Sequence, residues 1–256
     1  MRYTILLAII VIISSCQNST QETKSATPAV KIKYPAQLAK VFDNHGGLDK
    51  WKSMKVLSYE IEKEEGNEKQ TIDLHNRREK IEASDFTSGF TGKEYWVEAD
   101  TSYKGNAKFY TNLMFYFYAM PFVLADEGIN YTKTTPISYE GKSYPGIGMS
   151  YSDGIGIAPK DEYFLHYDPD TNEMAWLGYT VTFFSGEKGK KKSYIRYNDW
   201  KKFNGVKLPN SLTWFKVEDG QLIEPNNTRN FVNVVVFEKG FDDDMFAKPA
   251  GAKVVD

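Results

Sequence analysis

The sequence predicts a mainly β protein with helices (α+β), built as one large curved antiparallel sheet, an incomplete β-barrel, wrapped around a central apolar helix. Three observations lead to this fold class. Apolar and polar residues alternate along most of the chain after residue 56, which is typical of strands buried on one face. Turn-forming Asn, Asp, Gly and Pro residues separate these segments at short intervals. One aromatic segment, residues 107–125, interrupts the alternation.

The first sixteen residues have the pattern of a bacterial lipoprotein signal. Arg2 precedes an unbroken apolar run, residues 5–13, which is too short to span roughly 30 Å of hydrocarbon but suits a secretory signal. Ser14, Ser15 and Cys16 follow, and this ending resembles a lipobox, in which the chain is cut before a cysteine that is then lipidated. Cys16 is the only cysteine of the chain. We therefore predict that Cys16 carries acyl chains that anchor the protein to a membrane.

The remaining chain divides into a tether and one folded domain. Residues 17–33 are polar and rich in Ser, Thr and Lys, with too few apolar groups to form a core. After them no internal repeat or second linker is evident. We therefore expect a signal peptide over residues 1–15, the lipidated cysteine and flexible tether over 16–34, and a single domain over 35–256.

Two short helices open the predicted domain. Apolar residues spaced i, i+3 and i+4 indicate one buried helix face over residues 36–44. Gly46 and Gly47 end this helix, because glycine tolerates the left-handed conformation found at helix C-termini. Leu48 and Trp51 then indicate a second helical turn.

Strands with short turns make up most of the domain. Residues 231–237 (FVNVVVF) are apolar on both faces, which predicts a strand in the middle of the sheet with cover on each side. Asn204-Gly205 and Asp219-Gly220 are typical hairpin turns, as are Asp168-Pro169-Asp170 and residues 186–189. The expected strands lie around residues 57–61, 72–74, 81–83 and 95–97, and over 144–151, 163–167, 174–184, 193–200, 208–217 and 228–239.

The aromatic segment predicts a helix, or two helical pieces about Pro121, that fills the concave face of the sheet. Its apolar load exceeds what one helix face can bury against one sheet, so it can pack on the sheet and still leave an apolar cavity, or form a lid, beside it. Ordinary core packing is the competing interpretation for each residue alone. The candidate lining residues of this cavity are Phe115, Phe117, Met120, Phe122 and Leu124.

Composition and motifs exclude several classes of protein. The formal net charge of -2 argues against a nucleic-acid binder. One cysteine cannot form an internal disulfide, and His45, His75 and His166 are scattered in turns and at polar strand positions, where surface histidines are expected. No nucleotide-binding, hydrolase or metal-binding motif is complete. We therefore expect no enzyme activity, no cofactor and no metal site.

Five short motifs carry a resemblance to a known family. In chain order they are HGGLDKW (45–51), MKVLSY (54–59), YDPDT (167–171), FNGVKLP (203–209) and FAKP (246–249). Together with the lipobox and the order of elements, they resemble the LolA/LolB-like lipoprotein-carrier superfamily over residues 36–250. In particular they resemble the uncharacterised outer-membrane lipoprotein-sorting-like lipoproteins of Bacteroidota.

The resemblance implies an incomplete β-barrel around helices, with a hollow that accepts acyl chains and no catalytic residues. The soluble carriers of this superfamily have no lipid anchor, so the anchor predicted at Cys16 is a departure from them. An anchored protein looks more like the receptor that takes lipoproteins from the carrier, or like a relative with another apolar ligand. We therefore expect an outer-membrane lipoprotein that faces the periplasm and acts in lipid or lipoprotein trafficking. Its expected partners are a lipid or acyl chain, the membrane through the anchor, and other envelope lipoproteins.

Two alternatives remain open at this stage. A scaffolding module that binds envelope proteins or glycans would have a filled barrel and exposed aromatic patches. A hydrolase would show a polar cleft with converging carboxylates of perturbed pKa. The residues expected in exposed patches are Tyr95, Trp96, Tyr103, Trp176 and Trp214.

Overall fold

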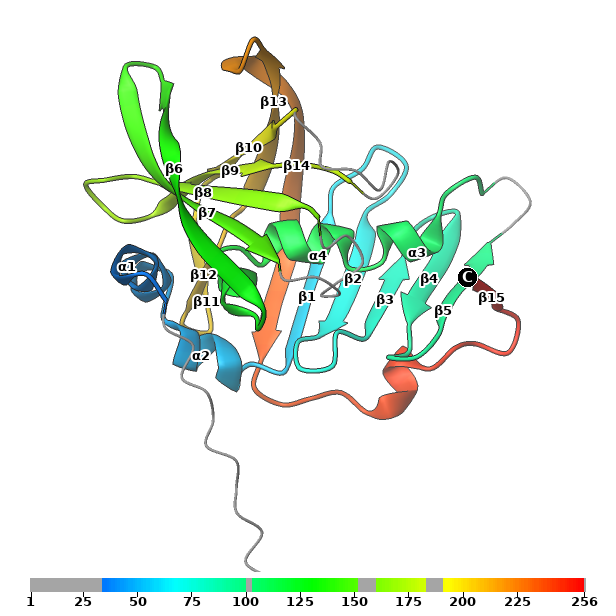
Figure 1. Cartoon of the computed structure of the whole chain (residues 1–256). Helices are drawn as coiled ribbons and strands as arrows, with labels where there is room; N and C mark the ends of the chain where they lie inside the picture. The colour runs from blue at the N-terminus through cyan, green and yellow to red at the C-terminus, as the bar shows by residue number, and fades with distance from the viewer. Residues whose placement is uncertain (1–33, 100–102, 152–159, 183–190, 256) are drawn as a thin grey trace, which may run out of the picture. The chain divides into compact units, whose positions relative to one another are not determined.

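A computed structural model describes residues 34–99, 103–151, 160–182 and 191–255 (Figure 1). The predictions made for the signal peptide, for lipidation of Cys16, for the tether up to residue 33 and for the turn over 186–189 lie outside the described residues. Residues Lys33–Asp256 group into one compact unit.

The described strands form two meanders that share one antiparallel sheet (Figure 1). The order across the sheet is β15-β5-β4-β3-β2-β1-β14-β13-β10-β9-β8-β7-β6. The first meander comprises β1 (Val56–Ile61), β2 (Glu68–Asp73), β3 (Glu79–Glu82), β4 (Phe86–Phe90) and β5 (Tyr95–Ala99), with β15 (Lys253–Val255) at its edge. The second comprises β6 (Ile129–Tyr139), β7 (Lys142–Tyr151), β8 (Glu162–Tyr167), β9 (Met174–Tyr179), β10 (Ser193–Asn198) and β13 (Ser211–Glu218).

One long strand, β14 (Gln221–Phe237), joins the two meanders. Its C-terminal part pairs with β1, so that Phe231 lies opposite Ile61 and Phe237 opposite Val56. Its earlier residues pair with β13, from Gln221 opposite Glu218 to Asn230 opposite Ser211. The prediction that residues 231–237 lie in the middle of the sheet is therefore confirmed.

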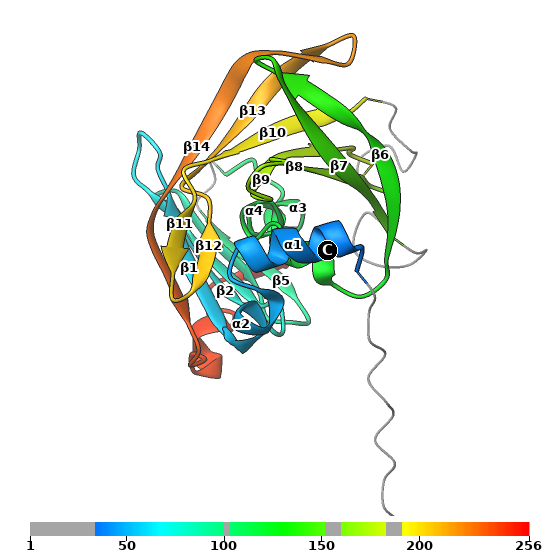
Figure 2. The ribbon, with the colours of Figure 1, turned by 90° about the vertical axis from the view of Figure 1, so that its left-hand side faces the viewer.

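The helices lie on the concave side of the curled sheet (Figure 2). The helices on this side are α1 (Ala36–Asn44), α2 (Leu48–Ser53), α3 (Ala107–Tyr110), α4 (Leu113–Tyr118) and the 3-10 helix η1 (Phe122–Ala125), whereas a second 3-10 helix, η2 (Asp243–Phe246), follows β14 and contacts β3. Pro121 separates α4 from η1, as the sequence predicts, because proline lacks the N–H that a continuing helix needs. The predicted fold class, a large curved sheet that is not closed and that surrounds a central apolar helical segment, is confirmed.

The end of α1 shows how a local signal positions the site. The Gly47 N–H donates to the Phe42 carbonyl oxygen at 2.8 Å, and both glycines have positive φ. A Cβ on Gly46 would lie 2.3 Å from the Gly205 carbonyl oxygen, in the hairpin of β11 (Lys201–Phe203) and β12 (Val206–Leu208). The two positive φ values turn the chain directly into α2, one wall of the pocket described below.

The structure departs from the expected pattern in three strands. Two of them, β4 and β6, are not among the expected strands. β6 contains Pro136 and polar residues and β4 contains Gly89, so neither shows the regular alternation of apolar and polar residues that predicts a strand. The expectation that β14 is covered on both faces is wrong. Phe231 and Val236 are buried, but Val235 and Phe237 on the face opposite the core are each 40% exposed.

Candidate functional site

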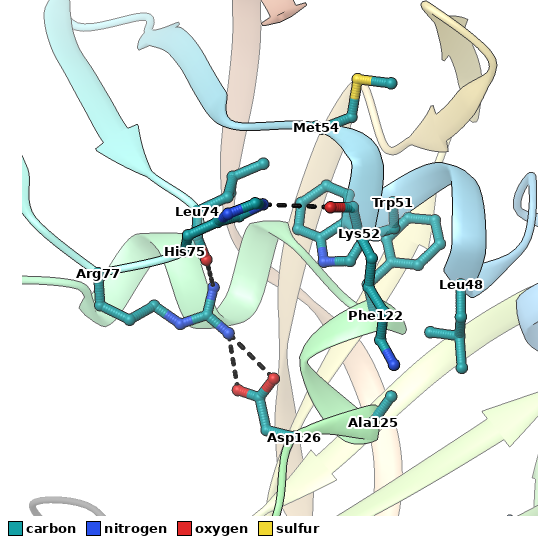
Figure 3. A pocket seen from close by; sticks show the side chains of 10 residues that line it. All are labelled: Leu48, Trp51, Lys52, Met54, Leu74, His75, Arg77, Phe122, Ala125 and Asp126. Atoms are coloured by element: carbon teal, nitrogen blue, oxygen red, sulfur yellow. Dashed lines mark hydrogen bonds and ion pairs between the residues drawn. The ribbon is translucent and has the colours of Figure 1, made fainter. Parts of the chain in front are cut away.

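A pocket of about 280 Å³ opens where α2, the β2–β3 turn and η1 meet (Figure 3). No single segment of sequence forms it, because its walls come from three regions that the fold brings together. Its lining comprises Leu48, Trp51, Lys52, Met54, Leu74, His75, Arg77, Phe122, Ala125 and Asp126.

One wall of the pocket is apolar and rigid. The rings of Trp51 and Phe122 stack with centroids 4.6 Å apart and planes inclined by 5°. Both side chains are almost fully buried, and Leu48 and Ala125 extend this surface. Such a wall favours contact with an apolar chain, because each methylene that leaves water contributes about 0.8 kcal/mol.

The opposite rim is charged. Arg77 donates from Nη2 to both carboxylate oxygens of Asp126, at 3.0 and 2.9 Å, and from Nη1 to the Leu74 carbonyl oxygen at 2.8 Å. Its guanidinium also lies 5.0 Å from the ring centroid of Phe115. Burial raises the pKa of Asp126, and the Arg77 charge partly opposes that rise. The pair closes one side of the pocket (Figure 3).

Lys52 supplies a second cation at the same rim. Its backbone carbonyl oxygen is hydrogen-bonded to His75 Nε2 at 3.1 Å. In Figure 3 this side chain runs past Phe122 towards Ala125. Among the residues that the structure describes, its ammonium group has no hydrogen-bond or ion-pair partner.

The five candidate cavity residues all lie in the main core, where each is at most 8% exposed. Of these, Phe122 lines the pocket through its contact with Trp51. Phe117 packs instead on the rings of Tyr179 and Trp214, on the far side of the helical segment. Sequence reasoning missed Lys52, Arg77 and Asp126. No local signal links Arg77 to Asp126, because 49 positions separate them.

The aromatic residues expected in exposed patches are not exposed. Trp96 and Trp176 are fully buried, and Tyr95, Tyr103 and Trp214 are half-buried. Trp176 packs on Phe215 and Tyr139 across the outer face of the second meander. Strand alternation cannot show this, because large side chains from other strands of the same sheet, here Tyr139 of β6 and Phe215 of β13, can cover a strand's outer face.

The histidines occupy three separate places, and the expectation that all are on the surface is wrong for two. His45 ends α1 with Nδ1 2.7 Å from the Val41 carbonyl oxygen, and His166 lies inside the sheet beside the Tyr144 carbonyl oxygen. Burial lowers the pKa of each to about 4. No group of three or more His, Cys, Asp or Glu side chains suited to a metal occurs within the described part of the chain.

Two carboxylates converge beneath α3 and α4, but they are sealed from solvent. Glu68 and Glu79 are both fully buried. Glu68 accepts hydrogen bonds from Gln70 and Tyr110, each at 2.7 Å, and Glu79 accepts one from the backbone N–H of Asn112. Burial raises the pKa of Glu79 to about 8, and the Glu68 charge adds to the rise. This network lacks the open cleft that a hydrolase would need.

Comparison with models of protein families and with curated protein sequences gives no match. No helix in the described ranges is long and apolar enough to cross a membrane.

Three of the solved structures that are similar to this chain are bacterial proteins. A LolA superfamily protein from Nitrosomonas europaea has 8% identity and a TM-score of 0.45, covering 76% of this chain and 89% of that one. A DUF1329 family protein from Desulfovibrio piger has 10% identity and a TM-score of 0.48, covering 82% and 97%. A putative outer membrane lipoprotein-sorting protein domain from Vibrio parahaemolyticus has 7% identity and a TM-score of 0.39, covering 75% and 88%.

Proposed function

We propose that this protein is a non-enzymatic cell-envelope lipoprotein that binds the acyl chain of a lipid, or a similar apolar ligand, in the pocket between α2 and η1. The observation that carries the proposal is the buried, stacked pair of Trp51 and Phe122 on one wall of that pocket. A pocket of about 280 Å³ has the volume of about nine water molecules at about 30 Å³ each. It therefore suits a short length of apolar chain.

The expected affinity is modest. A chain that buries about eight methylenes gains on the order of 6 kcal/mol before the cost of association. Binding of this strength is reversible, which suits a protein that takes up a lipid and passes it on. A longer chain would have to separate side chains of the main core, in which Phe122 lies.

The first described residue lies beside the pocket. Tyr34 donates a hydrogen bond of 3.3 Å to the carbonyl oxygen of Ala125, which lines the pocket. We propose that the protein lies on the periplasmic side of the outer membrane, anchored by acyl chains on Cys16.

Binding of decan-1-ol to the full-length protein, measured by isothermal titration calorimetry, tests this function. Leu48→Trp places a larger side chain in the pocket from a half-buried position, and should weaken binding about tenfold or more. Leu222→Trp is the matched control, because Leu222 is half-buried in β14 away from the pocket. Absence of binding to the unsubstituted protein, or equal weakening by both substitutions, would contradict the proposal.

A second candidate function is a binding module for another envelope protein, and one groove favours it. The groove has a volume of about 300 Å³ and lies on the face of β1, β2 and β14 opposite the core. Val235, Phe237, Phe241 and Met245 line it, and each is between 36 and 40% exposed. Phe241→Ser should then reduce cross-linking to an envelope partner in cells while leaving decan-1-ol binding unchanged.

A further inference from the structure

The rim of the pocket carries more positive than negative charge. Lys52, Arg77 and Asp126 are its charged residues, and the Arg77 guanidinium is already engaged by Asp126. One cation, Lys52, is left without a compensating carboxylate within hydrogen-bond distance among the described residues. An apolar wall that faces an unpaired cation is suited to a molecule with an apolar chain and an anionic head.

We propose that the ligand of this pocket is an anionic amphiphile, whose chain lies along Trp51 and Phe122 and whose carboxylate or phosphate head binds the Lys52 ammonium. This inference rests on the proposed function and specifies the class of ligand. The head forms a charge-assisted hydrogen bond to Lys52, which is shorter and stronger than a bond between neutral groups. A neutral alcohol of the same chain length lacks that bond, and a cationic amine is repelled.

Asp126 controls how strongly the pocket prefers an anionic ligand over a neutral one. Its carboxylate competes with the ligand head for Arg77 and places a negative charge close to Lys52. Replacing it by asparagine keeps an oxygen that can accept from Arg77 but removes the charge. The rim then offers two cations to one anionic head, and anion binding should become tighter.

The test compares four ligands with the same ten-carbon chain on the full-length protein: decanoate, decyl phosphate, decan-1-ol and decylammonium, each below its critical micelle concentration. Calorimetry at pH 7 should show decanoate and decyl phosphate binding about five- to tenfold more tightly than decan-1-ol, and decylammonium more weakly. A larger gain for decyl phosphate would assign a phosphate head, and a larger gain for decanoate a fatty-acid head.

Two pairs of variants isolate the charges. Lys52→Gln should abolish the preference for anions, whereas Lys40→Gln, at an exposed position on α1, should leave it intact. Asp126→Asn should strengthen decanoate binding about threefold or more relative to decan-1-ol binding. Asp43→Asn removes the same charge from an exposed position on α1 and should have no effect.

The outcomes separate this inference from the proposed function. If decan-1-ol and decanoate bind equally well, the anionic amphiphile is excluded and acyl binding stands. If Lys52→Gln keeps the preference for anions, the role given to Lys52 is overturned and acyl binding again stands. If none of the four ligands binds, both proposals fail together. A preference for anions that also disappears in Lys40→Gln would reflect the overall charge of the protein and would overturn the role given to Lys52.

Discussion

Arg77 holds Asp126 through two hydrogen bonds, of 3.0 and 2.9 Å, and so connects the β2–β3 turn to the end of η1. This contact joins the first meander to the segment that leads into the second. Arg77 adopts a positive φ of 58°, which a residue with a side chain rarely does. Its guanidinium also faces the rings of Phe115 and Tyr116, so the side chain is held on several sides.

Breaking this contact should destabilise the protein modestly. Both side chains are partly exposed, so solvent screens the pair, and Arg77→Met should lower the free energy of unfolding by about 1–2 kcal/mol. Urea denaturation of Arg77→Met, Asp126→Asn and the double variant gives the coupling energy between the two residues. A coupling energy near zero would show that the ion pair does not link the two parts of the sheet.

Glu79 should make the protein less stable as the pH rises. Its pKa is about 8 in the folded protein, above its ordinary value, so the folded state holds the proton more tightly. The resulting stability is fully present below about pH 4.5 and is lost as the pH rises through 8. Glu79→Gln should remove this dependence and raise the free energy of unfolding at pH 9 by on the order of a few kcal/mol.

Urea denaturation between pH 5 and pH 9 measures this effect. Glu82→Gln is the matched control, because Glu82 lies on the same strand but is only half-buried and paired with Lys80. The same pH dependence in Glu79→Gln as in the unsubstituted protein would be incompatible with a protonated, buried Glu79.

His45 and His166 should have the opposite effect in acid. Burial lowers the pKa of each to about 4, below the value of about 6.5 in the unfolded chain. The stability they allow is fully present above pH 6.5 and is lost as the pH falls towards 4, because the unfolded chain then binds protons that the folded chain excludes. The melting temperature should therefore decrease steeply between pH 6.5 and pH 4.

The individual contributions can be separated by substitution. His166→Gln should weaken the decrease over that pH range, while His75→Gln, in the exposed β2–β3 turn, should leave it unchanged. Differential scanning calorimetry at several pH values gives the slope of melting temperature against pH for each variant. Equal slopes for the two variants would show that burial of His166 does not control acid stability.

Replacing Phe122 or Phe117 by alanine should destabilise the protein to a similar extent, but only the change at Phe122 should alter ligand binding. Each is buried in the core, so Phe122→Ala and Phe117→Ala should each lower the free energy of unfolding by about 3–5 kcal/mol. Only Phe122→Ala enlarges the pocket, because Phe117 lies against Tyr179 and Trp214.

Titration with decanoate and tetradecanoate distinguishes the two variants. Phe122→Ala should shift the preference towards the longer chain, and Phe117→Ala should keep the preference of the unsubstituted protein. If both variants prefer the same chain length as the unsubstituted protein, the chain does not lie against Phe122.

Local pattern accounts for most of the predicted fold. The helix over Ala36–Asn44 and its end at two glycines were predictable, because both depend on residues a few positions apart in the sequence. The spacing of apolar residues indicates the buried face of the helix, and the glycines adopt the positive φ that ends it. β6 was not, because Pro136 and its polar neighbours hide a strand that a long pairing with β7 stabilises. The exposure of Phe237 also escaped prediction, since periodicity shows that a residue is apolar but not that its face is left open.

The candidate site was less predictable than the fold. The aromatic segment indicated where apolar side chains gather, and Phe122 does line the pocket. The place of the pocket, however, depends on contacts between Trp51, the β2–β3 turn and η1. These three come together only in the folded structure. The charged rim of Arg77 and Asp126 depends on the same tertiary contacts.

The place of β14 has a consequence for how the domain folds. Strands β1 and β13 can each complete their neighbour pairing only with β14, which is the last long strand of the sheet in chain order. Until β14 docks, both present an open edge of unpaired N–H and C=O groups to any other extended chain. A partly folded domain that lacks β14 therefore exposes two edges at which it can aggregate.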